Sequence, residues 1–389
     1  MHIALITDGI WPYVMGGMQK HSYYICKYLA KNKVYVDLIH FNDSHYDISL
    51  LEFFTEEEKK YIHSICVDMP HSIKFPGHYI YNSYRHSKLI FDQIKSKLTS
   101  YDFIYTKGFT GWYLIGQKQK GAINCCNIGV KFHGYEMFQK APSLLTKLQH
   151  VFLLRRPVKK LSCLADVVFS YGGKITDIIR SIGVDAKKII ELPSGIEEES
   201  LITSIKPTKE TIRFLYLGRY ERRKGIEELT AALKKIIQEN STPFEFHFIG
   251  NIPDEKKILH PSITYHGELR DKKTLQEKIS TCDVLVCPSY SEGFPNVILE
   301  AMGNGLAIAA TMVGAVELMV NNKNGWIIGS SDTNSIITTL KLVCKEDAHS
   351  IDLKKGASLE KIKASFLWDD LLKILILKIT ELSSDKTNN

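Results

Sequence analysis

The sequence predicts an α/β protein of two facing, doubly wound parallel-sheet domains. At 389 residues the chain is longer than one ordinary domain of ~100 to 200 residues. Short apolar, β-branched runs alternate with amphipathic stretches of helix length, which is typical of parallel sheets buried on both faces. The alternation stops in the acidic, proline-containing segment 196–211 and then restarts. We therefore expect this segment to link two domains.

The first half of the chain contains the elements of one such domain. An apolar strand at 2–8 leads into a helix from Met18 to Lys31, which is followed by a strand at 34–41. Parallel strands joined in this way need right-handed crossover helices. Further strands are expected at 103–107, 127–134, 165–172 and 188–195.

The second half repeats the pattern. A strand at 212–218 precedes a helix from about Gly225 to Gln238. The amphipathic stretch 365–382 is expected to be a terminal helix that docks on the rest of the chain before a polar tail. Other strands are expected at 244–250, 263–267, 284–289, 306–311 and 326–329, other helices at 271–281 and 295–303, and the divisions of the chain at 1–195, 196–211, 212–364 and 365–389.

Composition and charge are those of a globular protein with an anionic partner. Hydrophobic residues make up 44% and charged residues 24% of the chain, which favours neither disorder nor a fibrous class. The net charge is +7, and lysine and arginine outnumber the acids by 9 up to Gly195. Such an excess attracts nucleic acid, an anionic membrane surface or a phosphorylated substrate, and the charge does not choose among them.

The sequence lacks the features of secreted and membrane-spanning chains. The start "MHIALITD" has no basic region and no small-residue cleavage site. The sequence contains no run of about 18 apolar residues, so it predicts no membrane-spanning helix. The eight cysteines include no Cys-x-x-Cys pair, and we interpret them as buried thiols in a reducing compartment. We therefore expect a cytoplasmic protein.

Open α/β sheets bind ligands at the carboxyl ends of their strands, and four candidate sites lie there. After the first strand, Gly16 and Gly17 open a helix whose free amides attract an anion, although such a pair is more often only a turn. After the strand at 212–218, Arg219 and Lys224 offer a planar fork and a mobile charge, which suit a diphosphate. The alternative is a solvated basic turn.

The other two candidate sites contain a histidine and two glutamates. His133 ends an apolar strand and is either a packed core residue or a site residue. The stretch 289–305 places Glu292 on a loop and Glu300 inside a helix, with Pro295 at the first helical position. A carboxylate among apolar neighbours needs donors, and sugar or ribose hydroxyls supply them. Capping or surface glutamates are the alternative.

Motifs of several other enzyme classes are missing. The sequence has no His-Glu-x-x-His, no Asp-x-Asp and no zinc-like spacing of cysteine and histidine. It also has no Gly-x-Ser-x-Gly elbow and no Walker loop. These observations argue against hydrolases and phosphoryl transfer.

Five segments together resemble a known enzyme family. The segments "MGGMQKH", "KFHG", "LPSGI", "GRYERRKG" and "SEGFPNVILEAMGNG" are similar, in order and spacing, to those of the family 4 retaining glycosyltransferases. The resemblance covers nearly the whole chain and implies the glycosyltransferase B (GT-B) architecture, with two facing Rossmann-like domains. The first domain would bind the acceptor and the second the nucleotide-sugar, and the terminal helix would cross back onto the first. Cationic side chains and helix N-termini would replace a metal ion.

The resemblance also implies a role for each candidate residue. Glu292 and His133 would be the catalytic residues, with Glu292 orienting the donor sugar and His133 lying beside it. Glu300 would bind the ribose hydroxyls. The donor diphosphate would be bound by Arg219, Lys224, Gly16 and Gly17, and the donor sugar by Glu292, Phe294, Asn296, Val297 and His133.

The segment 140–160 contains six lysines and arginines and no acid. Leu144, Leu148, Val151 and Phe152 recur at helical spacing, so we expect a basic amphipathic helix. Its apolar stripe either packs in the core or docks on the anionic inner face of the cytoplasmic membrane, within reach of a lipid-linked acceptor. Nucleic acid is not the expected partner because no recognition module accompanies the basic residues.

The expected function is that of a metal-independent, retaining glycosyltransferase. It would move a hexose or N-acetylhexosamine from a UDP-sugar, or alternatively a GDP-sugar, to a saccharide acceptor in the synthesis of a bacterial O-antigen, capsule or lipopolysaccharide. Two alternatives stay open, a phosphorylase-like enzyme with bound pyridoxal phosphate, which we do not expect, and a catalytically silent subunit that binds sugar-nucleotides. The sequence leaves open the donor sugar, acceptor, linkage and oligomeric state.

Overall fold

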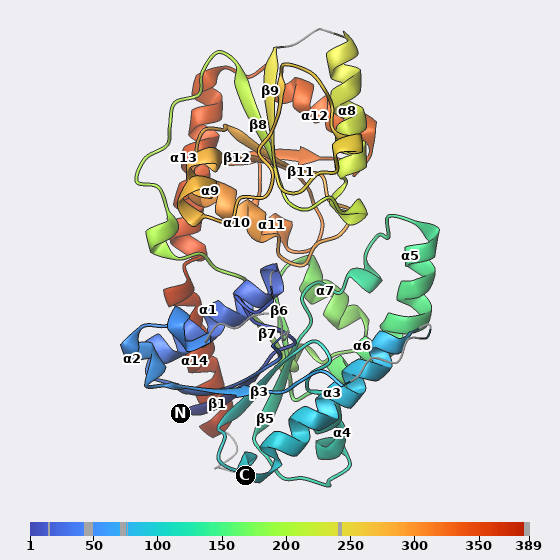
Figure 1. Ribbon diagram of the computed structural model, residues 1–389, viewed down its shortest axis with the longest axis vertical. Coiled ribbons are helices and arrows are strands. Elements are labelled where there is room, and N and C mark those ends of the chain that lie inside the picture. The colour runs from blue at the N-terminus through green and yellow to red at the C-terminus, as the bar shows by residue number, and fades with distance from the viewer. Residues whose placement is uncertain (15, 43–49, 71–74, 76, 240–242, 385–389) are drawn as a thin grey trace.

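The computed structural model describes residues 1–14, 16–42, 50–70, 75, 77–239 and 243–384. These residues form two lobes, and each lobe is built around one parallel sheet with helices packed on its faces (Figure 1). The predicted fold class, two doubly wound parallel-sheet units, is confirmed. Within the described residues, no helix is both long enough and apolar enough to cross a bilayer.

The sheet of the first lobe has seven strands in the order β3-β2-β1-β4-β5-β6-β7. The chain crosses from one side of the sheet to the other between β1 and β4, and open α/β sheets bind ligands above such a switch point. We did not predict the edge strand β3, because its sequence "IHSIC" is only partly buried and lacks a continuous apolar run. The strands are β1 (His2–Ile6), β2 (Tyr35–His40), β3 (Ile62–Cys66), β4 (Phe103–Lys107), β5 (Asn127–Lys131), β6 (Val167–Ser170) and β7 (Ile189–Glu191).

The sheet of the second lobe has six strands in the order β10-β9-β8-β11-β12-β13. Its switch point lies between β8 and β11, whose central residues are fully buried. All of these strands were predicted, and their observed ends differ from the prediction by a few residues. The strands are β8 (Ile212–Leu217), β9 (Phe244–Ile249), β10 (Ile263–Tyr265), β11 (Val284–Cys287), β12 (Ala307–Thr311) and β13 (Gly325–Ile328).

Helices connect the strands and cover both sheets (Figure 1). One predicted boundary is wrong by a residue: Pro295 caps α10 from outside, and the helix begins at Asn296. The α-helices are α1 (Gly17–Lys31), α2 (Glu56–Lys59), α3 (His78–Ile94), α4 (Trp112–Gln119), α5 (Leu144–Gln149), α6 (Arg155–Leu164), α7 (Lys174–Ser181), α8 (Ile226–Glu239), α9 (Lys272–Ile279), α10 (Asn296–Gly303), α11 (Val316–Met319), α12 (Thr333–Val343), α13 (Ala348–Ser365) and α14 (Trp368–Ser384).

The chain returns to the first lobe through a break between α13 and α14. The predicted terminal helix 365–382 starts too early, because Ser365 ends α13 and α14 begins only at Trp368. At the break the amide of Ile196 donates to the carbonyl of Phe366 (2.8 Å), and the amide of Trp368 donates to the carbonyl of Ile196 (3.2 Å). Helix α14 then packs beside α1 on the first lobe (Figure 1).

Within the described part of the chain, three clusters of buried apolar side chains hold the molecule together. One lies between the first sheet, α1 and α14, and another fills the second lobe. The third is continuous from the first lobe to the second and includes Tyr171, Phe294 and Phe366. The two lobes therefore share one apolar core at their interface.

Candidate active site

A cavity of about 400 Å³ lies between the lobes. Trp11, Lys20 and Tyr24 line it from the first lobe, and Leu269 and Glu300 line it from the second. Its mixed apolar and charged walls and its size are typical of a small-molecule site. Trp11, Tyr24 and Leu269 were not predicted, because only their position at the cleft, and no local motif, distinguishes them.

Glu300 points into this cavity from α10. Its side chain is 29% exposed, and its carboxylate lies 3.6 Å from the ammonium of Lys20 on α1. The ion pair therefore joins the two lobes across the wall of the cavity. A partly exposed carboxylate in this position can accept hydrogen bonds from hydroxyl groups of a bound ligand.

Glu292 lies on the loop before α10, and its side chain is only 5% exposed. Its carboxylate accepts hydrogen bonds from Lys224 Nζ (2.6 Å), Ser289 Oγ (2.7 Å) and Arg223 Nη1 (3.3 Å). Burial alone would raise the pKa of Glu292, but the charges of Lys224 and Arg223 hold it below its ordinary value. Glu292 is therefore an ionised, well-oriented acceptor.

In the basic turn after β8, some cationic side chains point toward Glu292 and others point toward solvent. Lys224 and Arg223 reach Glu292, whereas Arg219, which was predicted to face the diphosphate, is 74% exposed and pairs with Glu221 (2.7 Å). Arg222 points away as well and pairs with Glu228. The inward position of Arg223 was not predicted, because spacing does not reveal which arginine of a short 3₁₀ turn points inward.

The N-termini of α1 and α10 approach each other at the edge of the cavity. Gly16 precedes α1 and Gly17 begins it, and no acid lies in the first turn. A Cβ on Gly17 would lie 3.3 Å from Asn296 Nδ2, which donates weakly to the carbonyl of Gly17 (3.5 Å). Two sets of free helix amides thus converge, and their dipoles favour an anion between them. Val297 follows in the first turn of α10.

His133 follows β5 and touches the loop of Glu292. A Cβ on Gly293 would lie 1.6 Å from the His133 carbonyl oxygen, so only glycine allows this approach. Gln139 bridges the same two loops, since its amide donates to the carbonyl of Glu292 (2.7 Å). His133 Nδ1 lies 2.7 Å from the hydroxyl of Tyr171. The structure thus brings His133 and the Glu292 loop together.

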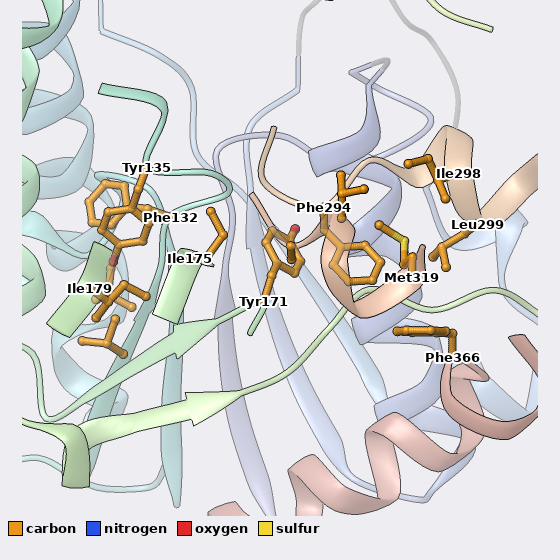
Figure 2. Packing of buried hydrophobic residues seen from close by; sticks show 14 of the residues in the cluster. Phe132, Tyr135, Tyr171, Ile175, Ile179, Phe294, Ile298, Leu299, Met319 and Phe366 are labelled. Atoms are coloured by element: carbon orange, nitrogen blue, oxygen red, sulfur yellow. The ribbon is translucent and has the colours of Figure 1, made fainter. Parts of the chain in front are cut away.

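Phe294 belongs to the interface between the lobes. Its ring is 7% exposed and packs against Tyr171 (5.3 Å between ring centroids) and Phe366 (5.8 Å). Figure 2 shows Phe294 between these two side chains. The contact with the donor sugar stays a prediction, and as a backbone contact it would not involve the ring.

Two buried lysines below the site were not predicted. Lys107 and Lys131 end β4 and β5, and neither is exposed. Lys107 Nζ contacts Ser22 Oγ (2.7 Å) and His21 Nδ1 (2.9 Å), and Lys131 Nζ donates to the carbonyl of Leu192 (2.7 Å). Burial lowers the pKa of both lysines far below the usual value. The sequence did contain a feature that could have pointed to them, because each lysine stands at the carboxyl end of an apolar strand.

Comparisons with known proteins define the class. The family described as glycosyl transferases group 1 matches residues 211–345. An uncharacterized glycosyltransferase of Methanocaldococcus jannaschii is 25% identical over 83% of this chain and 86% of that protein. The UDP-Gal:alpha-D-GlcNAc-diphosphoundecaprenol alpha-1,3-galactosyltransferase of Escherichia coli is 27% identical over 44% of this chain, which spans about half (49%) of that relative.

Solved structures agree with this class at the level of the fold. The sucrose-phosphate synthase of Thermosynechococcus elongatus superimposes with a TM-score of 0.77 and 18% identity, and 99% of each chain is covered. Two parallel-sheet lobes with a cavity between them match the GT-B architecture. Together, the matched family, the relatives and this fold make the chain similar to family 4-like glycosyltransferases of the GT-B architecture. The resemblance predicted from the sequence is confirmed.

Proposed function

We propose that this protein is a retaining, metal-independent glycosyltransferase that takes a hexose or N-acetylhexosamine from a UDP-sugar, or alternatively a GDP-sugar. The acceptor is a saccharide on a lipid carrier, in the synthesis of a bacterial surface polysaccharide. The observation that carries the proposal is the placement of Glu300 in the cavity and of Glu292, paired with Lys224 from the turn after β8, on the adjacent loop. The E. coli relative is named for a UDP-sugar donor and a diphosphoundecaprenol-linked acceptor, which supports these classes.

The nucleotide would occupy the cavity with its ribose hydroxyls donating to Glu300. The diphosphate would then lie between the N-termini of α1 and α10, where Gly16 and Gly17 let its oxygens approach the backbone. Lys224 would neutralise it from the second lobe, and Arg219 would turn inward from its solvent-exposed position to assist. These groups would stabilise the charge that develops on the leaving diphosphate, without a metal ion or other cofactor.

The donor sugar would lie between Glu292 and His133. Glu292 is buried, ionised and held by Lys224, so it is a fixed acceptor for sugar hydroxyls and orients the ring. The amides of Phe294, Asn296 and Val297 would contact the same sugar. In this arrangement the acceptor hydroxyl attacks the anomeric carbon of the donor sugar on the face of the leaving group. The bond from that carbon to the phosphate oxygen breaks, and the departing phosphate takes the proton of the hydroxyl. The protein contributes orientation and electrostatics.

A thermal-shift screen against UDP-, GDP- and ADP-sugars tests the proposal. A ligand that binds only the native state raises the unfolding temperature, so we expect a rise with UDP-sugars or, alternatively, GDP-sugars. The best donor is then incubated with diphosphoundecaprenol-linked saccharides, and the anomeric configuration of the product is read by NMR. Inversion of configuration would exclude the retaining mechanism, and no shift with any nucleotide-sugar would exclude the proposed donor class.

The helical segment 144–164 supports contact with an anionic membrane. It consists of α5, a π-helical turn (His150–Leu154) and α6, and α5 lies at the outer edge of the first lobe (Figure 1). Three side chains of its predicted apolar stripe are exposed: Leu144 by 80%, Leu148 by 53% and Phe152 by 73%. The alternative, an apolar stripe packed in the core, is therefore wrong for these side chains. We propose that they insert into the headgroup region of a bilayer.

The surroundings of this stripe fit an anionic surface. The exposed basic residues Lys147, Arg156 and Lys159 flank it, and each cation near an anionic leaflet contributes about 1 kcal/mol. A Cβ on Gly77, which precedes α3, would lie 3.4 Å from Leu153, and the exposed Tyr79 of α3 adds an amphipathic ring. Arg155 fixes the segment to the lobe, because its Nε donates to the carbonyl of Met137 (2.8 Å).

Vesicle flotation tests this contact. The wild type should bind vesicles that contain phosphatidylglycerol more strongly than vesicles of phosphatidylcholine alone, and Phe152→Glu should weaken this binding. Leu353→Glu is the matched control, because Leu353 is 62% exposed on α13 of the other lobe. Equal binding of wild type and Phe152→Glu, or no preference for anionic lipid, would contradict the membrane contact.

A further inference from the structure

Tyr171 joins three parts of the site from the end of β6. Its hydroxyl lies 2.7 Å from His133 Nδ1, and its ring packs on Phe294 at 5.3 Å between centroids. The ammonium of Lys131 lies 3.8 Å from the centre of the same ring, which is a close cation–π contact. Figure 2 shows Tyr171 facing Phe294 across the lobe interface. The side chain is 4% exposed, so these contacts fix it in place.

The contact with Tyr171 determines where His133 carries its proton. Burial raises the pKa of the Tyr171 phenol far above its usual value, with a smaller contribution from Glu136, so the hydroxyl keeps its proton. If it accepted a hydrogen bond from Nδ1–H instead of donating one, its own buried proton would lack an acceptor among the described residues, which favours donation to Nδ1. Among the described residues, its hydrogen-bond partner is His133 Nδ1. A nitrogen that accepts a hydrogen bond carries no proton, so the neutral ring must be protonated at Nε2.

The charged groups around His133 keep its ring neutral. Burial lowers its pKa well below the usual value, and the positive charges of Lys107 and Lys131 lower it further. The ring of His21 lies edge-on at 5.5 Å between centroids, and burial lowers the pKa of His21 as well. Among the described residues, the groups that shift the pKa of His133 all lower it, so the neutral imidazole is favoured.

The Nε2 atom of His133 is buried and has no hydrogen-bond partner within the part of the chain that the structure describes. A buried N–H without an acceptor is costly, and native proteins rarely leave one unless a ligand or water satisfies it. His133 lies at the loop contact with Gly293, directly beside the Glu292 loop. An oxygen of a ligand held by that loop would satisfy this donor.

We propose that Tyr171 is a positioning residue that fixes His133 as an Nε2–H donor to an oxygen of the donor sugar. The identification of the ligand as a donor sugar rests on the proposed function. The assignment of the His133 proton to Nε2 does not depend on it. With Nδ1 occupied by Tyr171 and Nε2 protonated, His133 has no free lone pair. It therefore orients the sugar by donating a hydrogen bond and does not act as a base.

The tautomer is read directly by ¹⁵N NMR of the full-length protein labelled at histidine. The His133 signals are assigned by their loss in His133→Gln. We expect an Nε2–H pattern in the wild type and a shift toward Nδ1–H in Tyr171→Phe, because this variant keeps the ring contacts with Lys131 and Phe294 and removes only the hydroxyl. An Nδ1–H pattern in the wild type, or an unchanged pattern in Tyr171→Phe, would overturn the proposal.

Tyr105→Phe is the matched control. Tyr105 is equally buried on β4, but its hydroxyl has no hydrogen-bond partner among the described residues. Removing it should leave the His133 signals unchanged. A change as large as that in Tyr171→Phe would mean that a general disturbance of the core, and not the Tyr171 hydrogen bond, sets the tautomer.

Calorimetry with UDP-galactose and UDP tests the contact with the sugar. Tyr171→Phe should weaken UDP-galactose by roughly three- to tenfold, the effect of one net hydrogen bond, and leave UDP unchanged. His133→Gln can place an amide donor near the Nε2 position and should retain more affinity than His133→Asn. If Tyr171→Phe lowered the affinities for UDP-galactose and for UDP by the same factor, the proposed contact with the sugar would be overturned. If the wild type binds neither probe, the proposed UDP donor fails while the NMR result still decides the tautomer.

Discussion

At the scale of single residues, the site depends on which cation reaches which carboxylate. Lys224 and Arg223 both contact the buried Glu292, whereas Lys20 contacts Glu300 at the cavity wall. Glu292 thus has two cationic partners and Glu300 has one, and in our proposal both carboxylates still accept hydrogen bonds from ligand hydroxyl groups. The two glutamates, seven residues apart, therefore have separate surroundings and, in our proposal, separate ligand groups.

Replacing Lys224 by alanine should weaken nucleotide binding. A phosphate that loses a charged hydrogen-bond partner loses ~1.5 to 3 kcal/mol, which is roughly a 10- to 150-fold rise in Kd for UDP. Isothermal calorimetry measures the change. Arg222→Ala is the control, because Arg222 pairs with Glu227 and Glu228 away from the cavity. Unchanged UDP affinity in Lys224→Ala would exclude Lys224 from the diphosphate site.

Glu292→Gln should change how stability depends on pH. The pKa of Glu292 is lower in the folded protein than its ordinary value, so its stabilising contribution is present above about pH 4.5 and is lost as the pH falls through the folded pKa. The wild type should therefore exceed Glu292→Gln in unfolding temperature most at neutral pH, with the difference shrinking below about pH 4.5. Thermal unfolding from acid to neutral pH measures this. A difference that is constant across this range would show that the Glu292 charge does not contribute.

At the scale of elements, the sequence predicted strands better than side-chain directions. Apolar runs such as "FIYTK" and "VLVC" match β4 and β11 closely, because strands buried on both faces need continuous apolar residues. The edge strand β3 and the helix α13 carried no such signal. The inward turn of Arg223 and the exposure of Arg219 depend on contacts with Glu292 and Glu221, which are distant or ambiguous in the sequence.

The break between α13 and α14 likewise depends on tertiary contacts. The sequence reads as one amphipathic stretch, but Ile196 pairs with the backbone on both sides of Leu367 and interrupts the helix. Trp368 then packs against Gly195, where a Cβ would lie 2.9 Å from the indole ring. The position of this break is therefore set by a residue about 170 positions earlier in the chain.

Trp368→Ala should destabilise the first lobe strongly. The indole is 1% exposed and packs near His21 (5.3 Å between centroids) and Tyr24 (5.6 Å). Truncating a buried tryptophan costs about 3–5 kcal/mol, so the urea midpoint followed by circular dichroism should fall clearly. Ile374→Ala is the control on the same helix, since Ile374 is 51% exposed, and it should change stability by less than about 0.5 kcal/mol. Similar shifts for both would argue against docking of α14 through Trp368.

At the scale of the whole molecule, the two lobes meet through contacts that also belong to the site. Phe294 packs on Tyr171, Gln139 bridges to the Glu292 loop, and Glu197 of the connecting segment binds Lys27 of α1 (2.6 Å) and Lys272 of α9 (3.0 Å). The position of the lobes therefore determines whether His133 and Glu292 face the same ligand. A change that separates the lobes should abolish transfer without touching any charged group.

Gly293→Ala tests this link between lobe position and activity. Its new Cβ would lie 1.6 Å from the His133 carbonyl oxygen and 2.9 Å from the Cα of Gly134, so the loops must move apart. We expect a larger radius of gyration by small-angle X-ray scattering and a strong loss of transfer. UDP binding should fall less than transfer, because Glu300 and Lys224 belong to the second lobe and only Gly16 and Gly17 of the first lobe would move away from the diphosphate. Gly116→Ala is the control, since a Cβ there meets nothing within 4 Å. Normal transfer by Gly293→Ala would show that close contact between the His133 and Glu292 loops is not needed for the reaction.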